Sequence, residues 1–331
     1  MIIVRTPLRI SFVGGGSDMK AFYAHNPGKV VCTAFDKFVY AIVKERFDDL
    51  IYINYSKKET VEHVDAIQHD LVREAMRITG VDKGVEITTL ADIPSSGSGL
   101  GSSSSITVAL LHALHTYQNT LVTAEQLARE ACRIEIDTLG KPIGRQDQYA
   151  AAYGGVNRFT FLPDDTTVRT PVRISGKVRR KFASSLLLYY TGITRSADDI
   201  LSRQKSNLGA DEKRRIMQAM VDLVDPFTEA MEQDDIQAYG RLLDENWRLK
   251  QQMAAGISNP VIDAMYHTAK AAGALAGKIS GAGGGGFLLL VVPRENQNQV
   301  FAAMRAYREL PFMLEDSGSK VIFDDRSYSS K

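Results

Sequence analysis

The sequence contains little cysteine. Two residues in 331, Cys32 and Cys132, are too few for a disulfide framework or a Cys-x-x-Cys metal pair. Both lie among apolar neighbours, so we expect small buried side chains. Long hydrophobic runs are also missing, since FLLLVV at 287–292 is far too short to span a bilayer. The amino-terminal segment carries Arg5 and Arg9 where a signal peptide needs an unbroken apolar run. These features predict a protein of the reducing cytoplasm that does not enter a membrane.

An excess of charge of one sign is absent as well. The 40 basic and 39 acidic residues give a formal net charge of +1, which argues against a general nucleic-acid binder. Hydrophobic residues make up 44% and charged residues 24%, proportions typical of folded chains rather than disordered ones. Because 331 residues are many for a single hydrophobic core, we expect two domains.

Strand and helix patterns alternate in the first half of the chain. β-branched and aromatic runs predict strands, and apolar residues at helical spacing predict helices. The strands are expected at 1–13, 30–45, 50–55 and 84–93, and the helices at 69–80, 102–118, 123–140 and 147–155. Thr123 and Gln126 fit a capping box, and Gly80 and Gly140 are placed to end their helices.

The second half is predicted to be mostly helical. The helices are expected at 196–207, 211–233 and 235–254, and from Asn259-Pro260 to about Gly277. A buried strand is expected at 181–192. The basic run KVRRK at 177–181 is interpreted as a solvated connection, with phosphate binding as the alternative. We therefore predict a mixed α/β (α+β) protein with domains at 1–178 and 179–331.

A stretch rich in glycine and serine, PSSGSGLGSSSS at 94–105, lies between a predicted strand and a predicted helix. Glycine lets the backbone approach a ligand closely, and N–H groups at a helix N-terminus attract phosphate. The stretch is neither a Walker A motif nor a dinucleotide fingerprint, because Ser102 stands where both need glycine. A phosphate-binding loop is favoured, and a flexible linker and a tight structural turn are the alternatives.

Two further glycine clusters lie near the ends of the chain. KISGAGGGG at 278–286 contains Gly-x-Gly-x-x-Gly, but a predicted helix precedes it and a strand follows it, the reverse of a dinucleotide site. Close approach to a ligand and a tight hairpin both explain these glycines. Near the other end, TPLRISFVGGGSD at 6–18 places a triple glycine after a strand, followed by Asp18.

Together these motifs resemble those of the GHMP kinase superfamily over essentially the whole chain. PSSGSGLGSS at 94–103 is similar to the central motif P-x-x-x-G-L-G-S-S, and KISGAGGGG is similar to the third motif. The triple glycine, GRQDQYAAAYGG at 144–155 and YYTGITRSADDIL at 189–201 look most like the heptose 7-phosphate kinases, with the fucokinases next. The resemblance implies a two-domain fold, with an N-terminal ribosomal-protein-S5-like domain and a C-terminal ferredoxin-like, helix-rich domain.

The same resemblance implies an activity. ATP would phosphorylate the anomeric C1 hydroxyl of D-glycero-D-manno-heptose 7-phosphate to the 1,7-bisphosphate, with Mg²⁺ as cofactor. The alternatives are a kinase for another sugar, such as fucose or an unphosphorylated heptose, and a non-catalytic regulator that binds sugar and ATP. The expected partners are ATP and a small sugar phosphate, with no nucleic acid and no membrane, and a homodimer stays open.

The resemblance also assigns residues to the nucleotide and the metal. The ATP-phosphate loop is expected to comprise Pro94, Ser96, Gly97, Ser98, Gly99, Leu100, Gly101, Ser102, Ser103 and Ser104. Ser103 and Glu135 are the implied Mg²⁺ neighbours, because Mg²⁺ prefers oxygen ligands and keeps several waters. Asp137 is the weaker candidate, and an acid on an exposed helix face is the alternative for Glu135.

Asp147 and Arg9 are the implied catalytic residues. We predict Asp147 at a helix N-cap, where the helix dipole favours an ionised carboxylate that accepts or orients the hydroxyl proton. Arg9 would stabilise charge on the transferring phosphoryl group. A structural cap and a surface charge are the respective alternatives. The implied acceptor site comprises Gly15, Gly16, Ser17, Asp18, Arg145, Arg195, Gly283 and Gly284, and Lys141 is a further candidate for holding the sugar phosphate.

Overall fold

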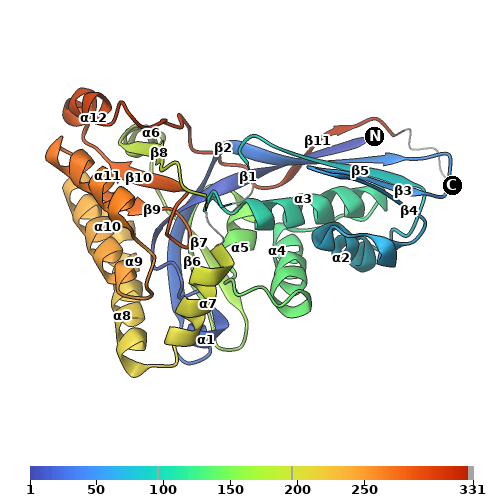
Figure 1. The fold of residues 1–331 in the computed structure, drawn as a ribbon, viewed down its shortest axis with the longest axis horizontal. Coiled ribbons are helices and arrows are strands. Elements are labelled where there is room, and N and C mark those ends of the chain that lie inside the picture. Colours follow the sequence, from blue (N-terminus) through green and yellow to red (C-terminus); the bar gives the residue numbers. More distant parts are fainter. Residues whose placement is uncertain (95–96, 195–196, 327–331) are drawn as a thin grey trace.

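The computed structural model describes residues 1–94, 97–194 and 197–326, and in this part of the chain the strands form two sheets (Figure 1). The larger sheet has the order β11 (Lys320–Asp324), β1 (Ile2–Val13), β2 (Gly28–Glu45), β5 (Val85–Ala91), β3 (Ile51–Asn54) and β4 (Lys58–Val61), and β6 (Val156–Phe161) and β7 (Thr167–Pro171) extend it from β2. The smaller sheet has the order β8 (Leu186–Tyr190), β10 (Phe287–Val291) and β9 (Ala276–Ile279). Neighbouring strands are antiparallel, apart from β3 and β5, which are parallel.

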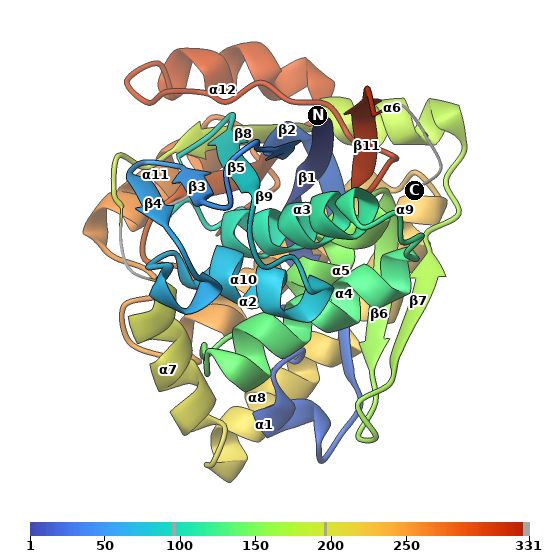
Figure 2. The same ribbon diagram turned by 90° about the vertical axis from the view of Figure 1, so that its right-hand side faces the viewer.

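The helices of the first half gather on one face of the larger sheet (Figures 1 and 2). α3 (Ser102–Tyr117) lies between β1 and β2 on one side and α2 (Asp70–Thr79) and α4 (Ala124–Cys132) on the other. A π-helical turn at Arg133–Thr138 follows α4, and α5 (Gln146–Tyr153) then packs against α3 and β1. This layer brings the starts of α3 and α5 together beside β1.

The second half of the chain is rich in helices, and several of them pack on the smaller sheet. The longer ones are α7 (Ala197–Asn207), α8 (Asp211–Asp222), α9 (Val224–Glu232), α10 (Ile236–Gln251) and α11 (Pro260–Ala271). The shorter helices are α6 (Gly176–Ser184) and α12 (Gln297–Ala303) here and α1 (Lys20–Tyr23) in the first half, and 3₁₀ turns lie at Val64–Ala66 in the first half and at Arg294–Asn296 in the second. α10 contacts β9, α8 and α9, so it links the smaller sheet to its helical cover.

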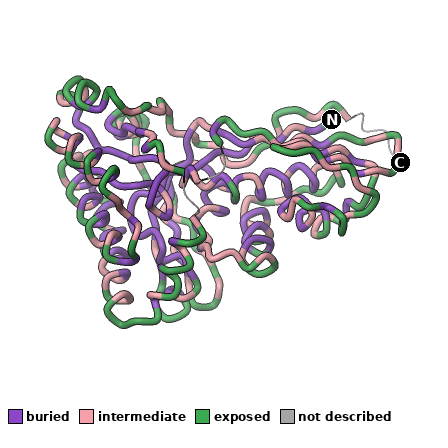
Figure 3. Tube along the Cα trace, viewed as in Figure 1, coloured by how far each residue is buried: buried purple, intermediate pink, exposed green. Residues whose placement is uncertain are grey.

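The carboxyl end of β1 joins the two halves of the core, which is drawn in purple in Figure 3. Phe12 stacks on Phe227 of α9 with ring centroids 5.6 Å apart and meets the edge of Phe182 of α6 at 5.3 Å. The buried Lys278 of β9 donates hydrogen bonds of 2.7 Å to the carbonyls of Ser11 and Phe12. The end of β1 is therefore held by both sheets, immediately before the triple glycine.

Several local predictions are confirmed. Thr123 caps α4 by accepting a hydrogen bond from the Gln126 N–H at 3.1 Å, and Gly80 ends α2 with a left-handed φ of 71°. Asn259 caps α11 through the N–H groups of Val261 and Ile262. These ends were predictable because each depends on one side chain or one glycine.

Other predictions in the second half are wrong. The basic run 177–181 is not a connection but part of α6, whose first turn is capped by Ser175, and the strand after it covers only Leu186–Tyr190. The helix expected at 211–233 is broken at Leu223 into α8 and α9. The glycine cluster 278–286 follows the short strand β9 rather than a helix, so it connects two antiparallel strands. The sequence of β9, AGKI, has little β propensity, so its pairing with β10 depends on tertiary contacts.

The last described strand returns to the first sheet, because β11 pairs with β1. The predicted boundary between residues 178 and 179 falls within α6, and the division into domains at 1–178 and 179–331 stays a prediction. Cys32 and Cys132 are buried and unpaired, as expected, and burial raises the pKa of the Cys32 thiol to about 12. Among the helices of the described residues, none combines the length and the apolar character that a membrane span needs.

Candidate active site

The described part of the predicted phosphate loop leads into α3. Gly97, Gly99 and Gly101 all have left-handed φ angles, of 70°, 70° and 80°. Gly101 is the N-cap residue of α3, so the helix begins at Ser102, as predicted. Ser102, Ser104 and Ser105 are buried, whereas Ser103 is exposed, so Ser103 is the serine of the helix start that solvent can reach. The predicted ATP contact Ser96 and the predicted acceptor contact Arg195 lie outside the described residues.

The phosphate loop packs directly on the third glycine cluster. A Cβ at Gly99 would lie 2.4 Å from the carbonyl oxygen of Ser280, and a Cβ at Gly286 would lie 2.4 Å from that of Ser98. A Cβ at Gly283 would lie 2.8 Å from the carbonyl oxygen of Ile257, and the Gly284 N–H donates a hydrogen bond of 2.8 Å to the same carbonyl. Backbone-to-backbone contact therefore explains these glycines, and Gly283 and Gly284 do not line the cavity around Asp18.

This contact gives a first prediction. Gly99→Ala should lower the thermal stability and raise the KM for ATP by about tenfold or more, because the new methyl group must displace the Ser280 carbonyl. Gly80→Ala is the matched control, since Gly80 has nearly the same φ but open space around it. The control should cost only about 1 kcal/mol of stability, from the left-handed conformation. Steady-state kinetics and thermal unfolding measure both effects, and an unchanged KM for ATP in Gly99→Ala would contradict this interpretation of the loop.

Arg9 and Asp147 form a bidentate ion pair below the loop. Arg9 donates from Nε to Oδ1 at 2.7 Å and from Nη2 to Oδ2 at 2.6 Å, and its Nη1 donates to the Gly99 carbonyl at 2.7 Å. The Arg9 side chain is 6% exposed, so it is not a surface charge, whereas the Asp147 side chain is 27% exposed. Arg9 therefore fixes the orientation of the Asp147 carboxylate, which stays partly accessible from the cavity beside the phosphate loop.

The predicted position of Asp147 at an N-cap is wrong. Arg145 is the N-cap residue of α5, and Asp147 is the second residue of the helix. Its carboxylate is bound by Arg9 rather than by the backbone N–H groups of the helix. The side chain at the second position of this helix points at β1, where Arg9 stands, and sequence spacing alone does not reveal that geometry.

Ser103 and Glu135, the two predicted neighbours of Mg²⁺, are in direct contact. The Ser103 hydroxyl donates to Oε1 of Glu135 at 2.6 Å, and the Gln148 amide donates to Oε2 at 2.8 Å. Glu135 is completely buried, so the alternative of an exposed helix-face acid is excluded. The weaker candidate, Asp137, is exposed and lines a different cavity with Arg145.

An ammonium group already contacts both predicted Mg²⁺ neighbours. Lys141 Nζ is 3.0 Å from Ser103 Oγ and 3.3 Å from Glu135 Oε1. A cation is therefore accommodated beside a hydroxyl and a buried carboxylate, which are the hard oxygen donors that Mg²⁺ prefers. Within the described ranges no group of three or more His, Cys, Asp or Glu side chains is placed to hold a metal. The residues thus fit an ion that takes its other ligands from phosphate and water.

Asp18 lines a cavity together with the Arg9–Asp147 pair. Its carboxylate accepts hydrogen bonds from the N–H groups of Gly16 at 2.9 Å and Gln146 at 3.1 Å. Burial raises the pKa of Asp18, although these backbone hydrogen bonds act in the opposite direction. We refer to this space as the acceptor cavity; its lining includes Arg9, Gly15, Gly16, Asp18, Gln146, Asp147, Gln204 and Lys250.

Two other predicted acceptor residues do not line this cavity. Ser17 is fully buried, and its hydroxyl donates to the Lys29 carbonyl at 2.9 Å. Arg145 donates to the carbonyl and the carboxylate of Asp165, at 2.6 and 3.0 Å, and lines the cavity that also contains Asp137. Conversely, Gln204 and Lys250 are parts of the acceptor cavity that the sequence did not suggest, because nothing in the local sequence of α7 or α10 marks them.

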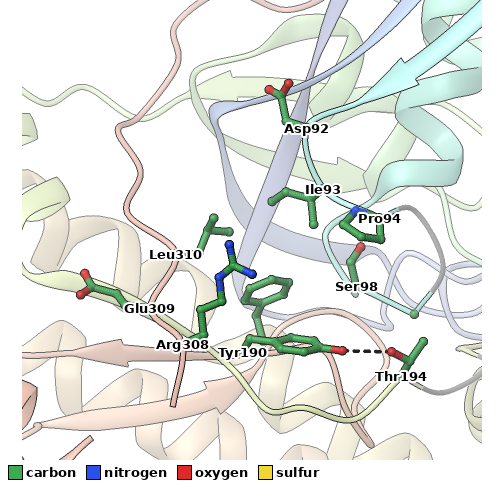
Figure 4. A pocket seen from close by; sticks show the side chains of 11 residues that line it. Asp92, Ile93, Pro94, Ser98, Tyr190, Thr194, Arg308, Glu309 and Leu310 are labelled. Atoms are coloured by element: carbon green, nitrogen blue, oxygen red, sulfur yellow. Dashed lines mark hydrogen bonds between the residues drawn. The ribbon is translucent and has the colours of Figure 1, made fainter. Parts of the chain in front are cut away.

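A separate, more apolar cavity lies on the other side of the phosphate loop (Figure 4). Pro94 lines this cavity together with Tyr190, whose hydroxyl is 3.0 Å from that of Thr194. The guanidinium of Arg308 points toward its centre. Gly97 and Ser98 line both this cavity and the one that contains Ser103, Glu135 and Asp147. The phosphate loop is therefore the wall between the two spaces.

Comparison with known proteins gives consistent matches. The family model described as GHMP kinases N terminal domain matches residues 62–155, and the one described as GHMP kinases C terminal matches residues 227–309. The D-glycero-alpha-D-manno-heptose 7-phosphate kinase of Campylobacter jejuni is 30% identical over 316 residues, which cover 92% of this chain and 93% of the relative. The L-fucokinase/L-fucose-1-P guanylyltransferase of Bacteroides fragilis is 25% identical over 335 residues, which cover 87% of this chain and 34% of the relative.

A solved structure is also similar over the full length. The crystal structure of a D-glycero-D-manno-heptose 1-phosphate kinase from Bacteroides thetaiotaomicron superposes with a TM-score of 0.82 at 26% identity. The match covers 99% of this chain and 100% of that one. Both sheets and the helices that carry the site therefore have counterparts in one known fold.

Proposed function

The chain belongs to the GHMP kinase family and is a sugar kinase, a phosphotransferase with an alcohol group as acceptor, and on this premise we propose that its acceptor is the anomeric C1 hydroxyl of D-glycero-D-manno-heptose 7-phosphate. ATP would be the donor, and the products would be ADP and the 1,7-bisphosphate. The heptose 7-phosphate is supported by the 30% identity with the Campylobacter jejuni enzyme over 92% of this chain. The reaction is supported by one observation above all: the Arg9–Asp147 pair lines both the cavity of the phosphate loop and the acceptor cavity.

The proposed phosphate site is the loop from Gly97 to Ser104. Its N–H groups at the start of α3 would bind the phosphates of ATP, because a helix N-terminus carries partial positive charge. Ser103 and Glu135 would hold Mg²⁺, which neutralises charge on the phosphates when it is bound. Lys141, which contacts both side chains, would then move away from them and pair with phosphate oxygens instead.

The proposed transfer takes place at Asp147. The acceptor hydroxyl oxygen forms a bond to the γ-phosphorus while the bond from that phosphorus to the β,γ-bridging oxygen breaks, and ADP leaves. Each Asp147 oxygen accepts one hydrogen bond from Arg9 and retains a lone pair for the hydroxyl proton. Arg9 would hold the carboxylate in line and stabilise charge at the phosphoryl group. We further propose that residues 1–178 and 179–331 act as the two domains that enclose these substrates.

A panel of acceptors tests the substrate. ADP release is measured with D-glycero-D-manno-heptose 7-phosphate, unphosphorylated D-glycero-D-manno-heptose, D-mannose 6-phosphate and L-fucose, each at several concentrations. We expect the highest kcat/KM for the heptose 7-phosphate, by about tenfold or more, since lost phosphate contacts are worth more than 1.4 kcal/mol. Turnover of L-fucose or free heptose with none of the heptose 7-phosphate would contradict the proposed acceptor.

A further inference from the structure

The acceptor cavity contains a buried amide with no partner. Gln204 of α7 is completely buried, yet neither its Oε1 nor its Nε2 has a hydrogen-bond partner among the described residues. Its amide lies against the triple glycine, because a Cβ at Gly16 would be 2.1 Å from Nε2. Leaving a buried polar group unsatisfied costs about 1–3 kcal/mol, so such groups are rare in native proteins and need an explanation.

An unpaired cation lies in the same place. Lys250 of α10 is 4% exposed and lines the acceptor cavity, and in the described part of the chain its Nζ has no hydrogen-bond or ion-pair partner. A Cβ at Gly15 would be 3.8 Å from this Nζ and 3.6 Å from Oε1 of Gln146. Buried charges in proteins are normally paired, so a lysine in this position is costly unless a ligand completes its contacts.

The charges around Lys250 do not fully offset the free-energy cost of burying its ammonium group. Burial lowers the pKa of Lys250 to about 8; the carboxylate of Asp18 opposes the shift, the guanidinium of Arg9 adds to it, and Asp147 opposes it. Lys278 is a further buried cation of this region, and burial lowers its pKa, with Lys250 and Arg9 adding to that shift. The carboxylates therefore offset only part of the desolvation of Lys250.

The unsatisfied groups together define the chemistry of a ligand. Nε2 of Gln146, which also lines the cavity, is buried without a partner, as are both polar atoms of Gln204. Gln146, Gln204 and Lys250 together offer mostly N–H donors to the acceptor cavity, while the carboxylates of Asp18 and Asp147 offer acceptors. Donors and acceptors in one small space match the hydroxyl groups of a polyol, each of which donates one hydrogen bond and accepts others.

We propose that Gln204 and Lys250 are acceptor-binding residues, which hydrogen-bond to sugar hydroxyl groups away from the hydroxyl that is phosphorylated. The inference rests on the proposed function in that the acceptor is a sugar. It also explains one member of the triple glycine, because Gly16 leaves the space that the side chain of Gln204 occupies. Acceptor selection thus depends on helices of the second half, whereas phosphoryl transfer depends on Arg9 and Asp147 of the first.

Kinetics of Gln204→Leu and Lys250→Met test the proposal, using the best acceptor in the panel above. We expect each variant to raise the KM for the acceptor by about tenfold or more, the usual loss for one or two hydrogen bonds, while the KM for ATP stays within about twofold. Lys270→Met is the matched control, because Lys270 donates to the Leu275 carbonyl and Asp244 and does not line the acceptor cavity. Its two KM values should stay at the wild-type level.

Deoxy analogues of the acceptor separate direct contact from indirect effects. If Lys250 binds a given hydroxyl, the increases in acceptor KM from Lys250→Met and from removal of that hydroxyl should not be additive. The variant assayed with the deoxy analogue should then have a smaller KM increase than the two single changes predict together. Fully additive penalties at every hydroxyl, or an unchanged acceptor KM in both variants, would overturn the proposal. An unchanged acceptor KM is the result expected if an ordered water, rather than the sugar, hydrogen-bonds to Gln204 and Lys250.

Stability supplies an independent readout for Lys250. Its pKa in the unfolded chain is about 10.4, so between about pH 8 and pH 10 the unfolded state binds more protons and this group's contribution to stability rises with pH. Lys250→Met should therefore raise the Tm of the free protein by a few degrees at pH 7 and by less near pH 10. A lower Tm with an unchanged acceptor KM would show that Lys250 is structural and would overturn the proposal.

The outcomes for the acceptor and for the two residues are distinguishable. If another sugar replaces the heptose 7-phosphate in the panel, the proposed substrate fails, and the variants are assayed with that sugar. If the heptose 7-phosphate is the substrate but neither variant changes its KM, the substrate stands and the role of Gln204 and Lys250 fails.

Discussion

Asp147→Ala is expected to lower kcat by about 10²–10⁴-fold, the usual contribution of a positioned acid or base. The carboxylate that accepts or orients the hydroxyl proton would be lost, while the phosphate loop would stay intact. The KM or Kd for ATP should therefore change little. Steady-state kinetics with the acceptor, and calorimetric titration with a non-hydrolysable ATP analogue, measure the two effects separately.

Two further variants distinguish the loss of a catalytic group from a simple folding defect. Asp147→Asn keeps the shape of the side chain but replaces one acceptor oxygen with a donor that faces Arg9, so it should be about as inactive as the alanine variant. Asp225→Asn removes a carboxylate that pairs with Lys29 and Arg158 outside both cavities, and it should retain wild-type kcat. Normal turnover by a folded Asp147→Asn enzyme would exclude Asp147 from the transfer step.

Glu135→Gln is expected to lower kcat/KM by about 10²-fold and to raise the Mg²⁺ concentration needed for half-maximal rate. A metal that stabilises transferring phosphate contributes several kcal/mol, and each 1.4 kcal/mol corresponds to tenfold in rate. The amide preserves the volume of the buried side chain but removes the charge beside Ser103 and Lys141. A Mg²⁺ titration of the rate at saturating ATP measures the change.

The control for this variant is Glu74→Gln. Glu74 is also a buried carboxylate in a helix, where it pairs with Arg73 and Arg77, and it does not line the cavities around the phosphate loop. Its replacement should lower the Tm without changing the Mg²⁺ dependence. If Glu135→Gln shows the same Mg²⁺ dependence as wild type, Glu135 is not a neighbour of the metal.

Local signals predicted much of the phosphate site. The helix start at Ser102 follows from a glycine loop at a helix N-terminus, whose geometry is fixed by adjacent residues. Ser103 was singled out by the family resemblance. Glu135 was predicted from the family resemblance, but its complete burial was not predicted. The helix there has a π-helical turn, in which the Leu139 N–H bonds the Ile134 carbonyl, and this turn is not visible in the spacing of apolar residues.

The acceptor cavity was less predictable, because it is built from contacts between distant segments. Gln204 and Lys250 lie in helices among polar residues that resemble an ordinary solvated face, and they become buried only when α7 and α10 pack on the triple glycine. Arg145 shows the reverse case: a basic residue beside Asp147 in sequence is turned away and held by Asp165. Side-chain direction at such positions is decided by tertiary packing, which local patterns do not encode.

Identification of the phosphorylated product tests the central claim most directly. The purified protein is incubated with ATP, Mg²⁺ and D-glycero-D-manno-heptose 7-phosphate, and the sugar product is examined by ³¹P NMR with ¹H coupling. The account predicts one ADP per sugar and a new phosphate signal coupled to the anomeric proton, next to the original 7-phosphate signal. A new phosphate on any other carbon, or ADP formation without a new sugar phosphate, would contradict it.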